Sequence, residues 1–252
     1  MTTETAKTVL ITGASSGIGA ATAVAAAEAG YDVAITFRTN RAGAEETAAK
    51  VRALGRRAVV IRADLSNPDD IEELFDRIDA EFDELDVLVN NAGIADEICR
   101  VEDMTPERLH RMFGVNSIGP FLCARQAAIR MAWRYGGAGG VIVNVSSIAA
   151  RLGSAGQYVD YAASKGAVDV LTKGLGEEMA ADKVRVVGVR PGIIDTEIHA
   201  KGGQPNRVAQ MANQLPMKRA GTAREVADTI LYLMSDKASY ITATSVDVAG
   251  AR

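Results

Sequence analysis

Short runs of β-branched residues alternate with long alanine-rich segments of helical periodicity along the whole chain, and this alternation limits the possible folds more than any other feature. The runs are apolar almost without interruption, which is typical of strands that helices cover on both faces. Strands that alternate with helices in this way join through right-handed crossovers. We therefore predict an α/β fold with a doubly wound, seven-stranded parallel sheet. The expected strands are 8–11, 32–36, 58–61, 87–89, 141–145, 184–189 and 245–248, and the expected helices are 17–29, 41–54, 68–83, 105–134, 158–182 and 223–235.

Residues 1–252 read as one domain, because no proline- or serine-rich linker, repeat or low-complexity tract divides them. One segment, 196–219, departs from the alternation, since it combines helical and loop signals without a strand pattern. An insertion after a strand end is where α/β sheets place segments that cover a substrate. A solvated surface excursion is the alternative, and the length of the segment fits both.

The composition excludes several classes of protein. A hydrophobic fraction of 48% excludes a disordered chain, and a formal net charge of −4 argues against nucleic acid or an anionic membrane surface as the main partner. No apolar stretch is long enough to span a membrane, and residues 1–4 show no secretory leader. Cys99 and Cys123 lack the spacing of metal ligands, and neither histidine has a second ligand at a plausible distance along the chain. We expect a cytoplasmic protein without a metal site.

Residues 12–19 read Thr-Gly-Ala-Ser-Ser-Gly-Ile-Gly and join the first expected strand to the first expected helix. Glycines in such a turn permit positive φ and a close approach of the backbone to a ligand, while the helix N-terminus offers unpaired N–H groups to an anion. Turns are often rich in glycine, so the glycines alone say little. Their place between a strand and a helix indicates a site for a nucleotide pyrophosphate.

The Gly-x-x-x-Gly-x-Gly spacing of this turn resembles that of the short-chain dehydrogenase/reductase family, in its one-domain branch. Five further motifs of that family follow in the same order, so that the resemblance covers nearly the whole chain. It implies a Rossmann domain and an oxidoreductase that transfers a hydride between a nicotinamide cofactor and a small carbonyl or alcohol substrate. The motifs are Asn-Asn-Ala-Gly at 90–93, Asn116 within the long helix, Asn-Val-Ser-Ser at 144–147, Tyr-Ala-Ala-Ser-Lys at 161–165 and Pro-Gly-Ile-Ile-Asp-Thr at 191–196.

The end of the second strand selects between NADP(H) and NAD(H). Residues 34–41 contain no carboxylate that would bind a ribose 2′-hydroxyl, whereas Arg38 is suited to pair with a 2′-phosphate and to stack on adenine. A solvated arginine at a strand end is the other interpretation, but we predict NADP, with NADPH favoured over NADH. Asp64 resembles the adenine-contacting aspartate of the family, although it is also placed to cap the turn before Pro68. The residues expected to bind the cofactor are Gly13, Ser15, Ser16, Gly17, Ile18, Gly19, Arg38, Asp64, Leu65, Asn91, Ala92, Gly93, Tyr161, Lys165, Pro191, Gly192, Ile194 and Thr196.

Tyr161 and Lys165 lie four residues apart in a helical pattern and therefore share one face. A phenol ordinarily ionises near pH 10, and a nearby ammonium, helped by the positive ring of an oxidised nicotinamide, favours the phenolate. We therefore expect the pKa of Tyr161 to be lowered, so that Tyr161 serves as general acid and base while Ser147 orients the reacting oxygen. A tyrosine–lysine pair at this spacing is by itself an ordinary helix-surface contact, and Ser147 and the phosphate-binding turn favour the catalytic interpretation. The resemblance implies that Lys165 also holds the nicotinamide ribose.

Asn116 is expected to lie at an irregularity in the long helix. Pro120 has no N–H to donate to the carbonyl of Asn116 four residues earlier, so a local kink is predicted there. The resemblance implies that Asn116 belongs to a proton relay from Lys165 to solvent. A helix bend that contains a buried amide is the alternative.

Ser147 and Tyr161 are fourteen residues apart, one more than is usual in the family, which leaves Ser146 and Ser147 as two candidates to face the substrate; we choose Ser147. Gln157 and Tyr158, in the loop between them, become candidate substrate contacts. The family resemblance implies a homotetramer. A rival function is a module that senses a nicotinamide nucleotide without turnover, and the presence of both Tyr161 and Lys165 argues against it.

Overall fold

The computed structural model describes residues 6–252, apart from the side chains of residues 199 and 201. The segment 1–4, on which the expectation about a leader was based, lies outside the described residues. Seven parallel strands form the predicted sheet in the order β3-β2-β1-β4-β5-β6-β9. Their bounds are β1 (Thr8–Ile11), β2 (Asp32–Phe37), β3 (Ala58–Arg62), β4 (Val87–Asn90), β5 (Gly140–Val145), β6 (Val184–Pro191) and β9 (Thr244–Val248).

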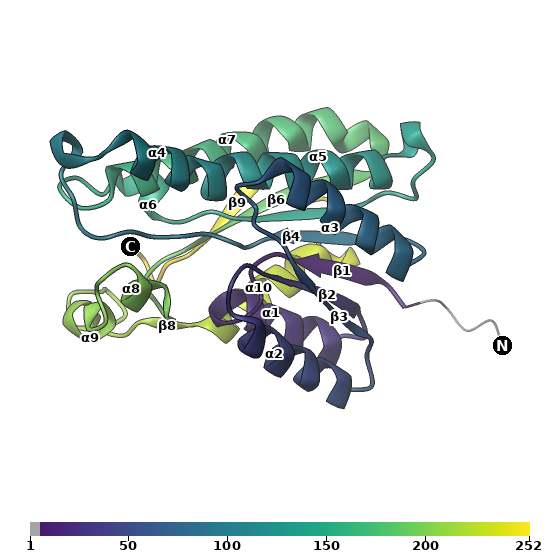
Figure 1. Ribbon diagram of the computed structural model, residues 1–252, viewed down its shortest axis with the longest axis horizontal. Coiled ribbons are helices and arrows are strands. Elements are labelled where there is room, and N and C mark those ends of the chain that lie inside the picture. Colours follow the sequence, from purple (N-terminus) through teal and green to yellow (C-terminus); the bar gives the residue numbers. More distant parts are fainter. Residues whose placement is uncertain (1–5) are drawn as a thin grey trace.

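Helices cover both faces of this sheet (Figure 1). The first layer contains α1 (Gly17–Glu28), α2 (Arg41–Ala53) and α10 (Ala223–Met234), and the second contains α3 (Pro68–Glu81), α5 (Gly119–Met131) and α7 (Val159–Met179). No helix in the described part of the chain is long and apolar enough to cross a membrane. The remaining helices are α4 (Pro106–Phe113), α6 (Ala149–Leu152), α8 (Ile198–Lys201) and α9 (Arg207–Ala212), with 3₁₀ turns at Val101–Asp103, Trp133–Tyr135, Ala180–Asp182 and Asp236–Ala238.

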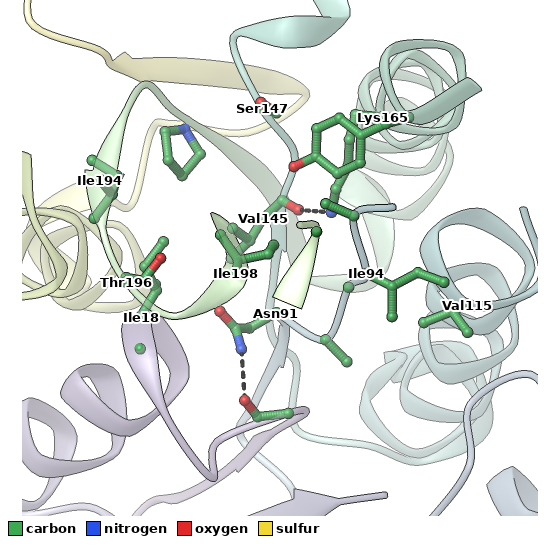
Figure 2. Close-up of a pocket in the computed structure, with 18 of the residues that line it drawn as sticks. Ile18, Asn91, Ile94, Val115, Val145, Ser147, Lys165, Ile194, Thr196 and Ile198 are labelled. Carbon is green, nitrogen blue, oxygen red and sulfur yellow. Dashed lines mark hydrogen bonds between the residues drawn. The ribbon is translucent and has the colours of Figure 1, made fainter. Parts of the chain in front are cut away.

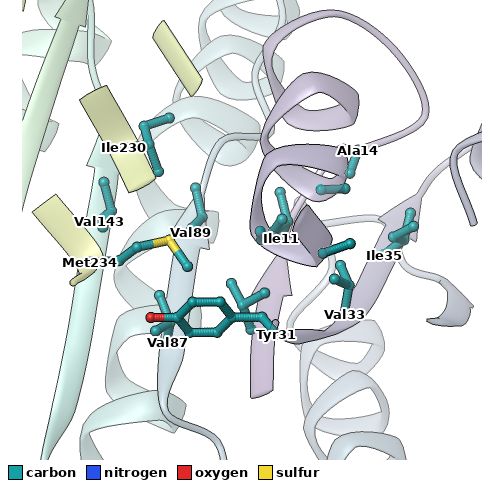
Figure 3. Close-up of a cluster of buried hydrophobic side chains, with 14 of the residues drawn as sticks. Ile11, Ala14, Tyr31, Val33, Ile35, Val87, Val89, Val143, Ile230 and Met234 are labelled. Atoms are coloured by element: carbon teal, nitrogen blue, oxygen red, sulfur yellow. The ribbon is translucent and has the colours of Figure 1, made fainter. Parts of the chain in front are cut away.

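The apolar core is divided between the two faces of the sheet, and strand β1 shows why. Val9 and Ile11 point into the layer of α1 and α10, whereas Leu10 points into the layer of α3 and α5, and all three side chains are fully buried. Figure 3 shows the first cluster, in which Ile11 lies among Val89 and Ile230. Burial on both faces explains why the strands are apolar at successive positions rather than at alternate ones.

The long helix expected at 105–134 is interrupted. A π-helical turn, Gly114–Ile118, separates α4 from α5, and Pro120 occupies the first turn of α5. The predicted irregularity is therefore present as a π turn, which is a common feature of functional sites. A second, two-stranded sheet, β7 (Ile194–Asp195) with β8 (Gly221–Thr222), flanks the segment 196–219. It was not predicted, because two residues are too few to show a strand period.

The order of the strands reverses between β1 and β4, which are neighbours in the sheet although β2 and β3 lie between them in sequence. In α/β sheets, ligands bind at such a switch point, beyond the carboxyl ends of the strands. The loops after β1, β4, β5 and β6 all leave the sheet at this edge, and α8 and α9 lie beyond it (Figure 1).

Candidate active site

A cavity of about 670 Å³ lies at this edge of the sheet, and Figure 2 shows the side chains around it. All of the residues predicted from the sequence to bind cofactor or to take part in the chemistry line it, except Gly19 and Asn116. Residues 38 and 161, at opposite ends of the predicted site, therefore belong to one continuous space. The wall also contains residues outside these predictions, among them Thr36, Phe37, Thr39, Asn40, Val115, Ile148, Ile193 and Arg252, while Ile198 and Arg207 come from the segment 196–219 that was expected to cover the substrate.

The glycine-rich turn is held in shape by its neighbours. Gly13 has a φ of +66°, and a Cβ atom there would lie 2.8 Å from Cα of Ala92, so no larger residue fits. The N–H of Gly13 donates to Oγ1 of Thr36 at 3.0 Å. The side-chain amide of Asn91 (Figure 2) donates to the carbonyl oxygens of Thr12 at 2.8 Å and of Gly13 at 3.1 Å. Asn91 thus fixes the turn as well as lining the cavity.

Gly19 lies apart from the other residues predicted to bind the cofactor. It does not line the cavity but lies beneath the turn, where a Cβ atom would approach Nδ2 of Asn91 to 2.5 Å and the carbonyl oxygen of Gly13 to 2.7 Å. Its lack of a side chain lets α1 pack closely against the turn. The motif contains three glycines, and their spacing alone does not distinguish those that face a ligand from one required for packing.

Arg38 and Asp64 lie together at one end of the cavity. The Arg38 side chain is about half exposed, and its Nη1 lies 4.0 Å from Oδ2 of Asp64. Burial opposes ionisation of Asp64, but the hydrogen bonds from Ser66 and the charge of Arg38 outweigh it and hold the pKa of Asp64 below its usual value. Asp64 accepts from the N–H of Ser66 at 3.0 Å and from its hydroxyl at 2.7 Å, so it both caps the turn and lines the cavity.

Ser147 and Tyr161 meet at the other end. The Ser147 hydroxyl interacts with that of Tyr161 and accepts a hydrogen bond from the N–H of Ala149 at 3.1 Å. The neighbouring Ser146 hydroxyl is occupied, since it donates to the carbonyl oxygen of Lys165 at 3.0 Å. Of the two candidate serines, Ser147 is therefore the one whose side chain meets Tyr161. Positive φ angles at Gly153, Ser154 and Gly156 turn the loop that contains the extra residue.

The pKa of Tyr161 differs from the sequence-based expectation. Burial raises it above the ordinary value of a phenol, and the hydrogen bond with Ser147 only partly offsets this. The ammonium of Lys165 lies 6.0 Å from the centre of the Tyr161 ring and donates to the carbonyl oxygen of Val145 at 2.8 Å (Figure 2). Because that ammonium is directed at a backbone carbonyl, its charge does not offset the rise in the pKa of Tyr161 that burial causes when no cofactor is bound.

Lys165 is itself 4% exposed, and burial lowers its pKa from 10.5 to about 8. A depressed folded-state pKa means that the unfolded chain binds more protons between pH 8 and 10.5, so stability rises with pH across this window. In the wild type, this effect raises the free energy of unfolding by roughly 3 kcal/mol from one end of the window to the other. In Lys165→Met we expect the rise to be absent. Urea denaturation of both proteins at a series of pH values measures it, and the comparison cancels the opposing titration of tyrosines. Parallel pH dependences in the two proteins would contradict the assignment.

Asn116 is fully buried within the π turn. Its side-chain amide donates to the carbonyl oxygen of Ile94 at 2.9 Å and to Oγ of Ser164 at 3.2 Å, and its Oδ1 accepts from the N–H of Ile94 at 2.8 Å. A Cβ atom on Gly93 would lie 3.3 Å both from Oδ1 of Asn116 and from Nζ of Lys165. Asn116 therefore stands behind the cavity wall, next to Lys165 across Gly93, and joins the π turn to α7.

The segment after β6 closes the cavity on the remaining side. A Cβ atom on Gly192 would lie 2.8 Å from Cα of Ala249, so β6 and the residues after β9 are in close contact here. Thr196 stands over the glycine-rich turn, since its Cγ2 lies 3.4 Å from where a Cβ on Gly17 would be. Figure 2 shows Ile194 and Thr196 on this side of the cavity.

Comparisons with known proteins agree with this arrangement. Residues 13–250 match the family described as Enoyl-(Acyl carrier protein) reductase. The uncharacterized oxidoreductase YgfF of Escherichia coli (strain K12) is 50% identical over 243 residues, which cover 96% of this chain and 98% of the relative. A short-chain dehydrogenase from Burkholderia cenocepacia J2315, solved in complex with NADP, superposes with a TM-score of 0.89 at 31% identity, covering 97% of this chain and 96% of that one. The 3-ketoacyl-(acyl-carrier-protein) reductase from Brucella melitensis, complexed with NADH, gives a TM-score of 0.90 at 33% identity and 98% coverage of both chains. The chain therefore belongs to the short-chain dehydrogenase/reductase family of oxidoreductases.

Proposed function

We propose that the protein is an NADP(H)-dependent oxidoreductase that interconverts a small carbonyl compound and its alcohol, with Tyr161 as general acid and base. One observation carries the proposal: the hydroxyls of Tyr161 and Ser147 and the buried ammonium of Lys165 share a single cavity with the glycine-rich turn. A protein that only senses a nucleotide does not need the hydroxyls of Tyr161 and Ser147 and the ammonium of Lys165 in the same cavity.

The turn fits a dinucleotide. Ser16 at the N-cap of α1 makes no side-chain capping bond, and no acidic residue lies in the first turn, so the N–H groups of this helix end face a site suited to an anion. Residues 13–18 would hold the pyrophosphate, Asp64, Leu65 and 91–93 the adenosine and the adjoining ribose, and Lys165 the second ribose. Pro191, Gly192, Ile194 and Thr196 would enclose the nicotinamide, which supplies or accepts the hydride when it is bound.

The chain's own groups handle the proton. In the direction of reduction, the Tyr161 hydroxyl donates its proton to the carbonyl oxygen of the substrate, while the Ser147 hydroxyl holds that oxygen in place. The Lys165 ammonium stabilises the resulting phenolate. We expect protons to pass between solvent and Lys165 by way of Asn116. This residue lies next to Lys165 across Gly93.

The choice of NADPH over NADH is tested at Arg38. We expect Arg38→Ala to weaken NADPH binding by roughly 1.5–3 kcal/mol, because a charge-assisted contact with the 2′-phosphate is lost, and to leave NADH binding nearly unchanged. Calorimetric titration of both nucleotides against both proteins measures this. Equal binding of NADH and NADPH, unmoved by the substitution, would show that Arg38 is only a solvated side chain. The exposed Arg224, which pairs with Glu28 and Asp228 away from the cavity, provides a control as Arg224→Ala.

The segment 196–219 is proposed to cover the substrate within a one-domain protein. Residues 196–198, Gly202 and Arg207 line the cavity, so the segment supplies part of its wall rather than a remote surface excursion. A location in the cytoplasm fits the two cysteines, Cys99 and Cys123, which are both free thiols.

A homotetramer is proposed because large apolar side chains remain exposed on the outer helices. Ile118, Phe121 and Ile129 lie on the π turn and α5, and Val170 on α7, with between 43% and 74% of their surface exposed. Covering such side chains is a common reason for subunit association. We expect light scattering to give the mass of four chains at micromolar concentration, whereas a monomer mass at every concentration would contradict the proposal.

A further inference from the structure

We propose that the substrate carries a carboxylate, which Arg207 binds with the help of Arg252 at the edge of the cavity near Tyr158. This rests on the proposed function, because it names the class of carbonyl compound that the same cavity reduces. The two arginines belong to segments that lie far apart in sequence, α9 and the residues after β9, and both line the cavity.

Arg207 is half-buried, and the groups that its side chain contacts carry no negative charge. The guanidinium lies 5.1 Å from the centre of the Tyr158 ring, and its Nη2 donates to Oε1 of Gln157 at 3.1 Å. Among the described residues, no carboxylate lies within ion-pair distance of it. Tyr158 begins the helix that carries Tyr161, so Arg207 is at the substrate end of the cavity rather than at the end of Arg38.

Arg252 adds a second positive charge to the same wall. Burial lowers its pKa, and the positive charge of Arg207 lowers it further. Arg252 is itself exposed, so it contributes its charge at the rim of the cavity, whereas the half-buried Arg207 provides the closer contact. A guanidinium offers parallel N–H donors that match the two oxygens of a carboxylate.

The other arginines around this end of the molecule differ in that each has a carboxylate partner. Arg100 pairs with Glu102, Arg108 with Asp160, Arg111 with Asp96 and Arg151 with Asp247. The acids on the cavity wall are also engaged: Asp64 accepts from Ser66 at the opposite end, and Glu197 has an interaction of its own. Among the described residues, Arg207 and Arg252 are therefore the arginines of the cavity wall that make no ion pair with a carboxylate, whereas Arg38 lies 4.0 Å from Asp64.

The rest of this end is apolar, since Ile94, Leu152, Ile198 and the Tyr158 ring contribute to the wall. A ligand that satisfies both features has a carbonyl for Tyr161, a short aliphatic body and a carboxylate at the far end. Oxo acids in which several carbons separate the ketone from the carboxylate have this form.

A structural role for Arg207 must be distinguished from binding. Its contacts with Gln157 and Tyr158 also join α9 to the loop before α7, so its removal can loosen the cover of the cavity. A loosened cover weakens every substrate alike, whereas loss of an anion contact weakens only the charged one. The comparison of an acid with its methyl ester therefore separates the two.

The experiment is a calorimetric titration of the protein saturated with NADP⁺. The oxidised cofactor has no hydride to donate, so a ketone binds to this complex without being reduced. The probes are 4-oxopentanoate, 5-oxohexanoate and 6-oxoheptanoate, each with its methyl ester. We expect the best acid to bind the wild type roughly tenfold or more tightly than its ester. Arg207→Met should abolish this ratio without weakening the ester, Arg207→Lys should keep part of it, and Arg252→Met should reduce it. Arg100→Met, which removes an arginine that already has a partner, should leave the ratio unchanged.

Three outcomes would overturn the inference: equal affinity for acid and ester in the wild type, an equal loss of both in Arg207→Met, or no binding of any oxo acid at millimolar concentration. The failure of the proposed function is seen separately. If NADPH is not consumed with any of the ketones, acids or esters, the proposed reaction is in doubt, while the calorimetric ratio still decides whether the cavity binds a carboxylate.

Discussion

Phenylalanine at position 161 is expected to lower kcat by about 10²–10⁴-fold. The ring and its packing remain, and only the hydroxyl that we propose to transfer the proton is lost. Cofactor affinity should change little, because the glycine-rich turn and Arg38 are untouched. The consumption of NADPH, followed by its absorbance with any ketone that the wild type reduces, gives the rate, and calorimetry gives the affinity for NADPH.

The pH dependence of the wild type provides a second test of the same group. Burial places the pKa of Tyr161 above the ordinary phenol value in the protein alone, so the phenolate needed for alcohol oxidation becomes available only as the pH rises. We expect the rate of oxidation to increase through the alkaline range and the residual rate of Tyr161→Phe to be flat there. A Tyr161→Phe variant that keeps the wild-type rate and profile would remove Tyr161 from the mechanism. Ser147→Ala, which retains the phenol but loses the hydrogen bond that lowers its pKa, should give a lower rate that rises at a higher pH than in the wild type.

Asp160→Ala is expected to lower the free energy of unfolding by about 3–5 kcal/mol. The Asp160 side chain is fully buried and that of Arg108 is 11% exposed, and they pair through two contacts, Nε to Oδ2 at 2.7 Å and Nη2 to Oδ1 at 3.3 Å. Removing the carboxylate leaves the guanidinium buried without its partner. Urea denaturation, followed by circular dichroism, measures the change.

Two comparisons make this prediction specific. Replacing both members of the pair, as in Arg108→Leu with Asp160→Leu, should cost much less than Asp160→Ala, because no unpaired charge is left. Asp228→Ala, which breaks an exposed pair with Arg224, should cost less than about 1 kcal/mol. If Asp160→Ala cost no more than Asp228→Ala, the buried pair would not contribute as the geometry suggests. Because Asp160 precedes Tyr161 directly, the variant also tests whether this pair positions the phenol.

The fold could be predicted almost completely, since most strands are covered on both faces and therefore read as apolar runs, although β9 at the edge of the sheet is largely exposed. The expected bounds of β1 are those observed, and the other six strands differ by no more than two residues at either end. The positions of Ser147 and Lys165 could be predicted because they are part of motifs whose order is set by the sheet. The two-stranded sheet of β7 and β8 could not, because it depends on contacts between residues 194 and 222 that no local pattern shows.

The chemical properties of the site were less predictable than its composition. The pKa of Tyr161 depends on how much water the fold excludes and on where the Lys165 ammonium points. The spacing of four residues between Tyr161 and Lys165 predicts neither. The place of Gly19 beneath the turn was not predictable, because packing and ligand binding favour the same residue type. Arg207 lies in the segment 196–219 that was expected to cover the substrate, but a segment without periodicity does not show which of its side chains turn toward the cavity.

The π turn at Gly114–Ile118 sets the rotational phase between two helices. In a regular α-helix, each residue advances the side chains by about 100° around the axis, and a π turn accommodates one extra residue before the regular helix resumes. On one side of it, α4 directs Arg108 toward Asp160, and on the other, α5 directs Cys123 into the core. Deletion of a single residue from the turn would restore a continuous helix and leave these two side chains about 100° out of step. The π turn thus allows one stretch of chain to direct Arg108 toward Asp160, next to Tyr161, and to pack Cys123 into the core beside the sheet.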